Sequence, residues 1–334
     1  MRKRLRIGIC GLGRIGSLHA KNVSSCPWEA ELVAVADPIK KLTRSVAARF
    51  GARAYFDPSL MIGSEDLDGV IICTPTPMHV SHVELAAEQN LSIFLEKPIS
   101  LNLKDADRIV SVVKRRHVKC MVGFNRRSDL SFGKAKREIV KGKIGKPILV
   151  KTCARDPQPP PESYIKNSGG IFVDECIHDF DVALWLMNSR VRRVSAIGKT
   201  LMYPQFAKYG DYDNAVAILE FRSGELGIIE GSRTSKYGYD LRTEVLGTEG
   251  SVNIDNWRDD STRLFTARGS IAEPGSWFLE RFADSYRNEL DRFYAYIRKD
   301  SVSPVSVEDG REALRVALAS TESAKKNSPV TLTD

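Results

Sequence analysis

Short apolar runs alternate with helical patterns along the first 124 residues of the chain. Residues 5–10 form an apolar run rich in branched side chains, and a helical pattern follows over residues 14–23. Further strands are predicted at residues 31–36, 54–56, 70–73, 92–95 and 120–123, with helices at residues 40–50, 59–63, 79–89 and 102–117. Six strands separated by helices predict an α/β domain with a doubly wound parallel sheet.

The pattern changes near residue 145. Strands are predicted at residues 148–154, 191–201, 214–221, 226–232, 242–246 and 262–266, and turns without helices separate several of them. Two long helices, at residues 278–299 and 307–323, close the chain. This order predicts a mostly antiparallel sheet and therefore an α+β second domain. With 334 residues in all, we expect one domain over residues 1–124 and another over residues 125–334.

A glycine-rich turn joins the first predicted strand to the first predicted helix. Gly11, Gly13 and Gly16 form a G-x-G-x-x-G motif, which allows a tight turn, close approach to a pyrophosphate and close packing of helix on strand. Asp37 ends the next strand, 21 residues after Gly16, where a carboxylate can accept the ribose hydroxyls of NAD. This context predicts dinucleotide binding by residues 11–16, Arg14 and Ile15 included.

Asp37 favours NAD over NADP, because its charge would repel the extra phosphate of NADP. Two observations leave alternatives open. Lys40 and Lys41 follow closely and could offset that repulsion, and Asp37 could also cap a helix that begins at Pro38.

Polar residues follow two further strands of the predicted sheet. In such sheets ligands bind at the carboxyl ends of the strands, so we assign Thr74, Pro75 and His79 after one strand, and Glu96 and Lys97 after another, to the cofactor side. Lys97 could simply be a salt-bridged strand end. Its position in the expected cleft favours a lysine that handles a proton or orients an alcohol beside the nicotinamide.

Residues 169–187 are predicted to form a largely buried helix that carries ionisable groups. Asp174, His178 and Asp181 recur at i, i+4 and i+7, which would place them on one face. A carboxylate one turn from a histidine can fix its tautomer, as general-base chemistry requires. A buried structural pair and a zinc site are the alternatives. Since the other four histidines lie in the first half of the chain, we expect no metal.

Charge, apolar run length and cysteine content limit the partners and the cellular compartment that we expect for this protein. Lys and Arg exceed Asp and Glu by 50 − 42 = 8, but the basic clusters lack interleaved aromatics and fit solvated helix faces, so we expect no nucleic-acid partner. No apolar run reaches the roughly 18 residues that span a bilayer, so no membrane association is expected. The six cysteines form no C-x-x-C pair, which favours a soluble protein of the reducing cytoplasm.

Several of these motifs together resemble one known family, that of glucose–fructose oxidoreductase, inositol dehydrogenase and the rhizopine-catabolism proteins. The resemblance covers about residues 7–330 and rests on residues 11–16, 96–98, 169–170, 174 and 178–181. Residues 123–127, 155–157 and 236–240 resemble the inositol dehydrogenases within it. The resemblance implies a Rossmann domain followed by an open-faced sheet, NAD as cofactor, and dimers or tetramers formed through those sheets.

The resemblance also implies roles for individual residues. Lys97, Asp174 and His178 take the positions of the family's catalytic residues. The positions that contact inositol in similar enzymes are Arg127, Asp156, Tyr239 and Tyr286. Thr76 departs from the asparagine that many members carry, which affects a contact on the nicotinamide side.

The leading functional hypothesis is an NAD-dependent dehydrogenase that oxidises one secondary hydroxyl of a cyclic polyol, myo-inositol to an inosose. Two alternatives remain open: a pyranose sugar dehydrogenase that uses the same residues, and a regulatory protein that senses NAD without turnover. The intact set of Lys97, Asp174 and His178 argues against the sensor, because a sensor needs no groups for proton transfer.

Overall fold

The protein is described here by a computed structural model that covers residues 3–256, 264–267, 269–271, 277–299 and 301–333. The chain forms two compact units. Unit 1 comprises Met1–Asn125 and Asp284–Glu312, and unit 2 comprises Arg126–Ala283 and Ala313–Asp334. This division differs from a single boundary after residue 124, because a segment near the C-terminus packs with the first unit.

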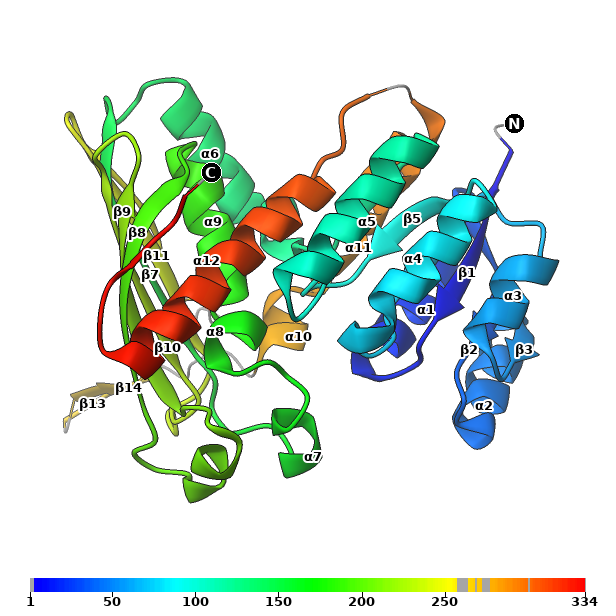
Figure 1. Ribbon diagram of the computed structural model, residues 1–334, viewed down its shortest axis with the longest axis horizontal. Coiled ribbons are helices and arrows are strands. Elements are labelled where there is room, and N and C mark those ends of the chain that lie inside the picture. The colour runs from blue at the N-terminus through cyan, green and yellow to red at the C-terminus, as the bar shows by residue number, and fades with distance from the viewer. Residues whose placement is uncertain (1–2, 257–263, 268, 272–276, 300, 334) are drawn as a thin grey trace. The chain divides into compact units, whose positions relative to one another are not determined.

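Unit 1 is built on a six-stranded parallel sheet (Figure 1). Its strands are β1 (Leu5–Cys10), β2 (Ala30–Ala36), β3 (Arg53–Tyr55), β4 (Gly69–Ile72), β5 (Ser92–Leu95) and β6 (Cys120–Val122). Their order in the sheet is β3-β2-β1-β4-β5-β6, so the chain reverses direction between β1 and β4. The doubly wound sheet predicted from the sequence is confirmed, and such a reversal is where ligands bind in this architecture.

Helices connect the strands of unit 1. They are α1 (Arg14–Ser25), α2 (Lys40–Phe50), α3 (Pro58–Ser64), the 3₁₀ turn η1 (Thr76–Met78), α4 (His79–Glu88) and α5 (Leu103–Arg116). Capping explains two of these starts. The side chains of Asp57 and Asn102 accept hydrogen bonds from the backbone N–H groups of Ser59 and Asp105, at the first turns of α3 and α5.

The helix predicted over residues 278–299 is two helices, α10 (Phe278–Arg281) and α11 (Ala283–Arg298). The prediction of one continuous helix was therefore wrong, because the helix is interrupted at Phe282. Helix α11 belongs to unit 1, where Lys119 donates to the backbone carbonyls of Tyr296 and Ile297 at 3.0 and 3.1 Å. Phe293 packs edge-on against Phe94 of β5, with ring centroids 5.6 Å apart. These contacts join residues nearly 200 positions apart, so local periodicity could not reveal them.

Unit 2 is built on a seven-stranded mixed sheet in the order β12-β11-β7-β10-β9-β8-β15. Neighbouring strands are antiparallel except β7 and β10. The mostly antiparallel sheet is thus confirmed. Its strands are β7 (Pro147–Arg155), β8 (Val191–Lys199), β9 (Asn214–Phe221), β10 (Leu226–Ser232), β11 (Asp240–Gly247), β12 (Ser251–Ile254) and β15 (Val330–Thr331).

A separate two-stranded ribbon pairs β13 (Leu264–Thr266) with β14 (Gly269–Ile271). The strand predicted over residues 262–266 falls partly here, and its first two positions lie outside the described residues. The remaining elements of unit 2 are α6 (Leu130–Val140), α7 (Glu162–Ile165), α8 (Ile171–Asp174), α9 (Ile177–Met187), the 3₁₀ turns η2 (Asn125–Ser128) and η3 (Pro204–Tyr209), and the later part of α12 (Val307–Lys326).

Helices cover one face of the seven-stranded sheet and leave the other open, as Figure 1 shows. Helix α9 packs on β7 and β10, and Ser323 of α12 accepts a hydrogen bond from the Ala196 backbone N–H on β8. Along β9, Ala217 and Leu219 are buried, whereas Val216 and Ile218 between them are 43% and 49% exposed. The open-faced sheet is confirmed, and its uncovered face carries apolar side chains.

No helix within the described ranges combines the length and the apolar character that crossing a bilayer requires.

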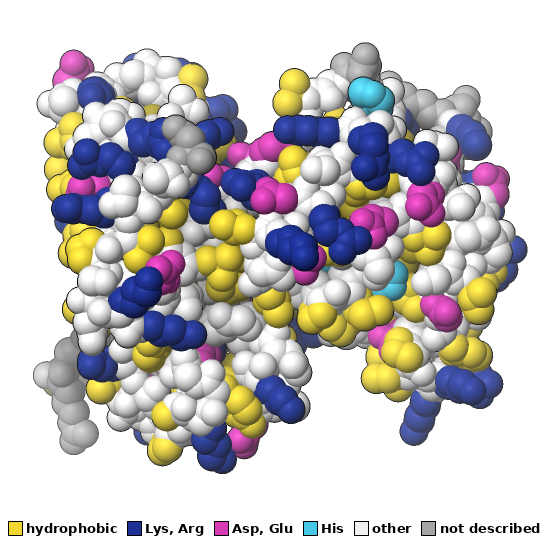
Figure 2. Space-filling view, in the orientation of Figure 1, with side chains coloured by type: hydrophobic (Ala, Val, Ile, Leu, Met, Phe, Trp, Pro, Cys, Tyr) yellow, Lys and Arg dark blue, Asp and Glu magenta, His cyan; other side chains and the backbone are white. Residues whose placement is uncertain are grey.

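Basic side chains are spread over the visible face of each unit in Figure 2. On the face drawn in Figure 2, Lys and Arg are interspersed with acidic, apolar and uncharged polar groups. The excess of positive charge is thus distributed over this face, as expected of solvated helix surfaces.

Candidate active site

The three glycines of the turn after β1 meet different surroundings. A Cβ on Gly11 would lie 2.5 Å from the Cys73 carbonyl oxygen, and one on Gly16 would lie 1.9 Å from the Gly11 carbonyl oxygen. Gly11 also has φ +85°, which favours glycine. A Cβ on Gly13 would meet nothing within 4 Å. Gly11 and Gly16 therefore allow close packing of the turn, while Gly13 faces open space where a phosphate could approach the backbone.

The start of α1 is suited to an anion. Among the described residues no side chain caps this helix, and its first turn contains no acidic residue. Arg14 is exposed and Ile15 is half-buried at the same turn. The N-terminus of a helix carries partial positive charge and presents backbone N–H groups, so these residues fit the pyrophosphate of a dinucleotide.

Asp37 connects the end of β2 to the glycine turn. Its Oδ2 accepts a hydrogen bond from the Leu12 backbone N–H at 2.8 Å, and its Oδ1 accepts one from the Ile39 N–H at 2.9 Å. The second bond forms a local turn before α2, which begins at Lys40 rather than at Pro38. The carboxylate thus fixes the glycine turn and the start of α2 together, at the place where a ribose would follow the pyrophosphate.

The loop after β4 is held from within unit 1. The His79 ring is 1% exposed, and its Nε2 lies 2.9 Å from the Thr74 carbonyl oxygen. Burial lowers the pKa of His79, so the ring is neutral near pH 7. Thr74 is buried and its hydroxyl lies 3.1 Å from His82 Nδ1, whereas Pro75 is exposed. His79 therefore supports this loop, and Pro75 is the part of it that reaches the surface.

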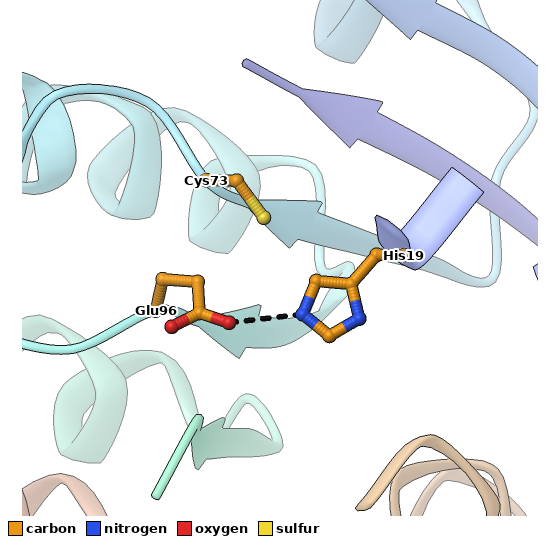
Figure 3. A group of neighbouring side chains, drawn as sticks. All are labelled: His19, Cys73 and Glu96. Atoms are coloured by element: carbon orange, nitrogen blue, oxygen red, sulfur yellow. Dashed lines mark hydrogen bonds and ion pairs between the residues drawn. The ribbon is translucent and has the colours of Figure 1, made fainter. Parts of the chain in front are cut away.

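Glu96 and Lys97 follow β5, where the Lys97–Pro98 peptide bond is cis. The Lys97 side chain is half-buried, and its backbone N–H donates to Glu96 Oε2 at 3.2 Å. Glu96 Oε1 lies 2.9 Å from His19 Nε2 on α1 (Figure 3). The glutamate of this segment thus faces the glycine-turn helix and holds the backbone of the lysine.

In unit 2, the helix predicted over residues 169–187 is interrupted between Asp174 and Ile177. The Cys176 N–H bonds to the Ile171 carbonyl, five residues back, at 2.9 Å. The prediction that Asp174 lies on the same helix as His178 and Asp181 was therefore wrong, whereas His178 and Asp181 do share α9. Successive side chains on a regular helix point about 100° apart, and the interruption lets adjacent Asp174 and Glu175 bind the same arginine.

That arginine is Arg233, which follows β10 and is 1% exposed. Its guanidinium donates to Asp174 Oδ2 at 2.8 Å, to Glu175 Oε2 at 3.0 Å and to Asp211 Oδ2 at 3.2 Å. Burial, with Asp156 and Asp174 nearby, raises the pKa of Glu175 well above its usual range despite the opposing effect of Arg233. Asp174 Oδ1 also accepts a hydrogen bond from the Tyr164 hydroxyl at 2.7 Å.

Arg233 was missed in the sequence analysis, although β10 offered a signal. Gly227, Ile229 and Gly231 are buried and alternate with exposed Leu226 and Ile228 and half-buried Glu230, so the strand's period of two leads inward to residue 233. An arginine at an inward position requires buried carboxylates as partners. The long spacing to Asp174 hid which carboxylates those are.

Two neighbouring arginines of η2 bind the carboxylates of α9. Arg127 donates through Nε and one terminal nitrogen to Asp181 at 3.0 and 2.6 Å, and its guanidinium lies over the Trp185 ring at 5.7 Å. Arg126 donates to Asp179 at 2.7 Å. All four charged side chains are buried, so both pairs rigidly join η2 to α9. Asp181 is therefore the ion-pair partner of Arg127, whereas the sequence analysis grouped it with His178.

The other expected site residues have distinct surroundings within their own units. In unit 2, His178 on α9 and Asp156 after β7 are half-buried, and the Asp156 backbone is fixed by Ser232 and Ser235. Tyr239 is 6% exposed, and burial raises the pKa of its phenol, which stays protonated. Tyr286 on α11 of unit 1 is 7% exposed and packs edge-on against His19.

Two models of one known protein family match most of the chain. Residues 5–124 match the model described as "Oxidoreductase family, NAD-binding Rossmann fold", and residues 136–332 match its "C-terminal alpha/beta domain". The chain belongs to this oxidoreductase family. Its nucleotide domain is thus an NAD-binding Rossmann fold, and the family resemblance inferred from the motifs is confirmed.

Three similar proteins bear on the chemistry. Myo-inositol 2-dehydrogenase of Thermotoga maritima is 40% identical over 98% of each chain. The NAD⁺-dependent scyllo-inositol 2-dehydrogenase of Bacillus subtilis is also 40% identical, over 99% of this chain and 97% of its own. A crystal structure of scyllo-inositol dehydrogenase from Lactobacillus casei, with bound NAD(H) and scyllo-inositol, matches with a TM-score of 0.93 and 30% identity over 98% of this chain and 99% of that one.

Proposed function

We propose that this oxidoreductase is an NAD-dependent dehydrogenase that oxidises a secondary hydroxyl of a cyclic polyol, with myo-inositol as the preferred substrate and an inosose as the product. The observation that carries the proposal is the full-length similarity, at 40% identity, to inositol 2-dehydrogenases. The candidate catalytic residues Lys97, Asp174 and His178 are all present and support it.

Bound NAD would supply the acceptor for the hydride that leaves the oxidised carbon. Backbone groups at Gly11, Gly13, Arg14, Ile15 and Gly16 would hold its pyrophosphate. Asp37 would accept the ribose hydroxyls while it keeps its bonds to the turn. On the nicotinamide side, we assign contacts to the segments Thr74–Pro75 and Glu96–Lys97, with His79 supporting the first of them.

Proton transfer is assigned to side chains of both units. His178 would take the proton of the substrate hydroxyl as general base. Lys97 would donate a hydrogen bond to the same oxygen and stabilise the negative charge that develops there. Asp174 is held by Arg233 and Tyr164 and lies four residues before His178, and its carboxyl group would favour the protonated imidazole once the proton has moved.

Substrate hydroxyls would be recognised by Arg127, Asp156, Tyr239 and Tyr286. Arg127 is already fixed by Asp181, and the Asp156 backbone is fixed by the neighbouring strands, so these groups are preorganised for a rigid ring. A site built to bond each hydroxyl discriminates against analogues that lack one, because its own polar groups are then left unpaired.

The test is NADH formation, measured by absorbance, with NAD and a panel of myo-inositol, scyllo-inositol, glucose and linear polyols. We expect myo-inositol to give the highest kcat/KM, with weaker activity on other ring stereoisomers and almost none on linear polyols. A pyranose as best substrate would favour the sugar dehydrogenase. NAD binding without turnover on any member of the panel would favour the sensor.

We also infer that copies of the chain associate through the open face of the seven-stranded sheet, as dimers or tetramers. Six apolar side chains on this face are 36–62% exposed: Ile197, Val216, Ile218, Leu226, Ile228 and Leu246. A row of exposed aliphatic side chains across adjacent strands is typical of an interaction surface. Light scattering with size-exclusion chromatography tests this, and Ile218→Asp should shift the protein to monomers. A wild-type monomer at micromolar concentration would contradict the inference.

The cysteines support a cytoplasmic location. All six lie within the described ranges and are free thiols, and Cys10, Cys120 and Cys176 are buried. A reducing compartment maintains such thiols. Cell fractionation would test this proposal, and recovery of the protein outside the cytoplasm would contradict it.

A further inference from the structure

A cluster of ionisable side chains lies beneath the Glu96–Lys97 segment, inside unit 1. It consists of His19 on α1, Glu96 after β5 and Glu289 on α11. His19 and Glu289 are fully buried, and Glu96 is 8% exposed. Figure 3 shows His19 and Glu96 facing each other, with the Cys73 side chain beside them. Three separate segments of the chain thus bring two carboxyl groups and one imidazole into the core.

The hydrogen bonds in this cluster are unevenly distributed. His19 Nε2 lies 2.9 Å from Glu96 Oε1 and 3.9 Å from Glu289 Oε1. Glu96 Oε2 accepts the Lys97 backbone N–H. Both carboxyl oxygens of Glu289, and His19 Nδ1, are buried without a hydrogen-bond partner among the described residues. In a neutral ring, donation from His19 Nε2 to Glu96 would leave Nδ1 without a proton, and an unpaired acceptor is the less costly arrangement.

The charged form of Glu289 would have little compensation in this position. An isolated buried carboxylate is strongly disfavoured, and two carboxylates that share a site cannot both ionise readily. Burial and the nearby Glu96 raise the pKa of Glu289 well above its usual range, against a smaller opposing effect of Arg292. Cys73 lies beside His19 and Glu96, and burial keeps its thiol protonated. Burial and repulsion by Glu96 thus favour the neutral acid at Glu289.

A bound metal ion is the competing explanation. His19 Nε2, Cys73 Sγ and a Glu96 oxygen lie within 4.8 Å of one another, and zinc accepts nitrogen, sulfur and oxygen ligands. However, the imidazole and the Glu96 carboxylate are already at hydrogen-bond distance, and a thiol must lose its proton to ligate. The distances therefore favour a hydrogen bond between His19 and Glu96 over a bound metal ion.

We propose that Glu289 is a positioning residue for Lys97, acting as a neutral acid that leaves His19 to bond Glu96 alone. An ionised Glu289, 3.9 Å from His19 Nε2, would compete with Glu96 for the imidazole proton. The bond from His19 fixes Glu96, and Glu96 in turn holds the backbone N–H of Lys97. This role rests on the proposed function, in which Lys97 acts on the substrate hydroxyl.

The test compares Glu289→Gln, which has the shape of the neutral acid, with Glu289→Leu. We expect Glu289→Gln to keep kcat within about twofold of wild type. Glu289→Leu also leaves the imidazole proton to Glu96, but it replaces the planar carboxyl group beside His19 with a branched side chain. It should therefore shift the His19–Glu96 pair and lower kcat about 10- to 100-fold with little change in KM, as expected when a reacting group is slightly misplaced. Asp284→Asn removes an exposed carboxylate from the same helix as a matched control and should change neither constant. If Glu289→Leu does not fold, Glu289→Asp, one methylene shorter, replaces it.

A second measurement does not depend on turnover. Nitrogen NMR of labelled histidine distinguishes the two neutral tautomers from the imidazolium, and with five histidines in the chain the His19 signal can be assigned by substitution. We expect the neutral Nε2–H form of His19 in wild type and in Glu289→Gln.

Three results would overturn the positioning role: an imidazolium signal from His19, equal loss of kcat in Glu289→Gln and Glu289→Leu, or stoichiometric zinc in the purified protein that Glu289→Gln loses. Full activity of Lys97→Met would instead contradict the proposed function and leave the NMR result for the cluster intact.

Discussion

Arg233 donates a hydrogen bond to Asp174 across 59 positions of sequence, at 2.8 Å and with almost no exposure of the guanidinium. The same arginine binds Glu175 and Asp211. Because the candidate catalytic Asp174 on α8 depends on a charge supplied by the residue after β10, its position is a property of the unit 2 core. The local helix alone does not determine it.

The first prediction concerns this arginine. Arg233→Lys retains the charge but loses the fork that reaches three carboxylates, so we expect kcat to fall by about tenfold, consistent with a loss of roughly 1.4 kcal/mol. Arg233→Met leaves buried carboxylates unpaired and should destabilise the fold by about 3–5 kcal/mol. Steady-state kinetics and urea unfolding measure the two effects. Wild-type kinetics in Arg233→Lys would show that the forked contacts do not support Asp174.

The second prediction concerns cofactor choice. Since Asp37 would repel the phosphate of NADP, the wild-type protein should prefer NAD, and Asp37→Ser should erode that preference. Asp37→Asn is the matched control, because an amide oxygen can still accept the Leu12 N–H while the negative charge is gone. Ratios of kcat/KM for the two cofactors provide the measurement. Equal efficiency with NADP in the unmodified protein would contradict the assignment.

The third prediction concerns the general base. His178→Ala should lower kcat by about 10²- to 10⁴-fold, the usual contribution of such a group. NAD affinity, measured by fluorescence titration, should barely change, because His178 lies in unit 2 and the glycine turn lies in unit 1. Asp174→Asn should also impair turnover while the circular dichroism spectrum stays native. Loss of folded structure in both variants would support a purely structural pair instead.

The fourth prediction links Glu289 to stability. Its pKa is raised in the folded state, so between the unfolded and the folded pKa folding takes up a proton, and the stability that Glu289 contributes falls as pH rises. Each pH unit in that window costs about 1.4 kcal/mol. Glu289→Gln removes the titration, so its Tm relative to wild type should increase from pH 5 to pH 8. A constant Tm difference over that range would argue against a raised pKa.

The sequence predicted elements whose limits are set locally. Strands β1, β9 and β10 and helix α2 occupy the predicted residues, because an apolar run or a helical period ends there at a glycine or a turn. The break after Asp174 was not predictable in this way. The spacing of Asp174, His178 and Asp181 fits one helix, and only the distant Arg233 and Arg127 show that the carboxylates serve different partners.

The same distinction holds for the candidate site. The glycine turn, Asp37 and the Glu96–Lys97 segment follow from motif spacing, since backbone geometry requires those residues at those places. The contacts of Arg233, and those of Glu289 with His19, depend on strands and helices far apart in sequence. Their residue types are visible in the chain, but their partners are not.

The route of the chain has a consequence for synthesis. Residues up to Asn125 leave the ribosome 284 − 125 = 159 positions before the start of the segment that carries α11. Until that helix arrives, Phe94 lacks the packing of Phe293, and His19 lacks the contacts of Tyr286 and Glu289. The nascent nucleotide-binding half therefore carries an uncovered apolar surface, a state that chaperones recognise. For the same reason, a truncated chain that ends at residue 125 should express as an aggregation-prone fragment rather than as an independent NAD-binding module.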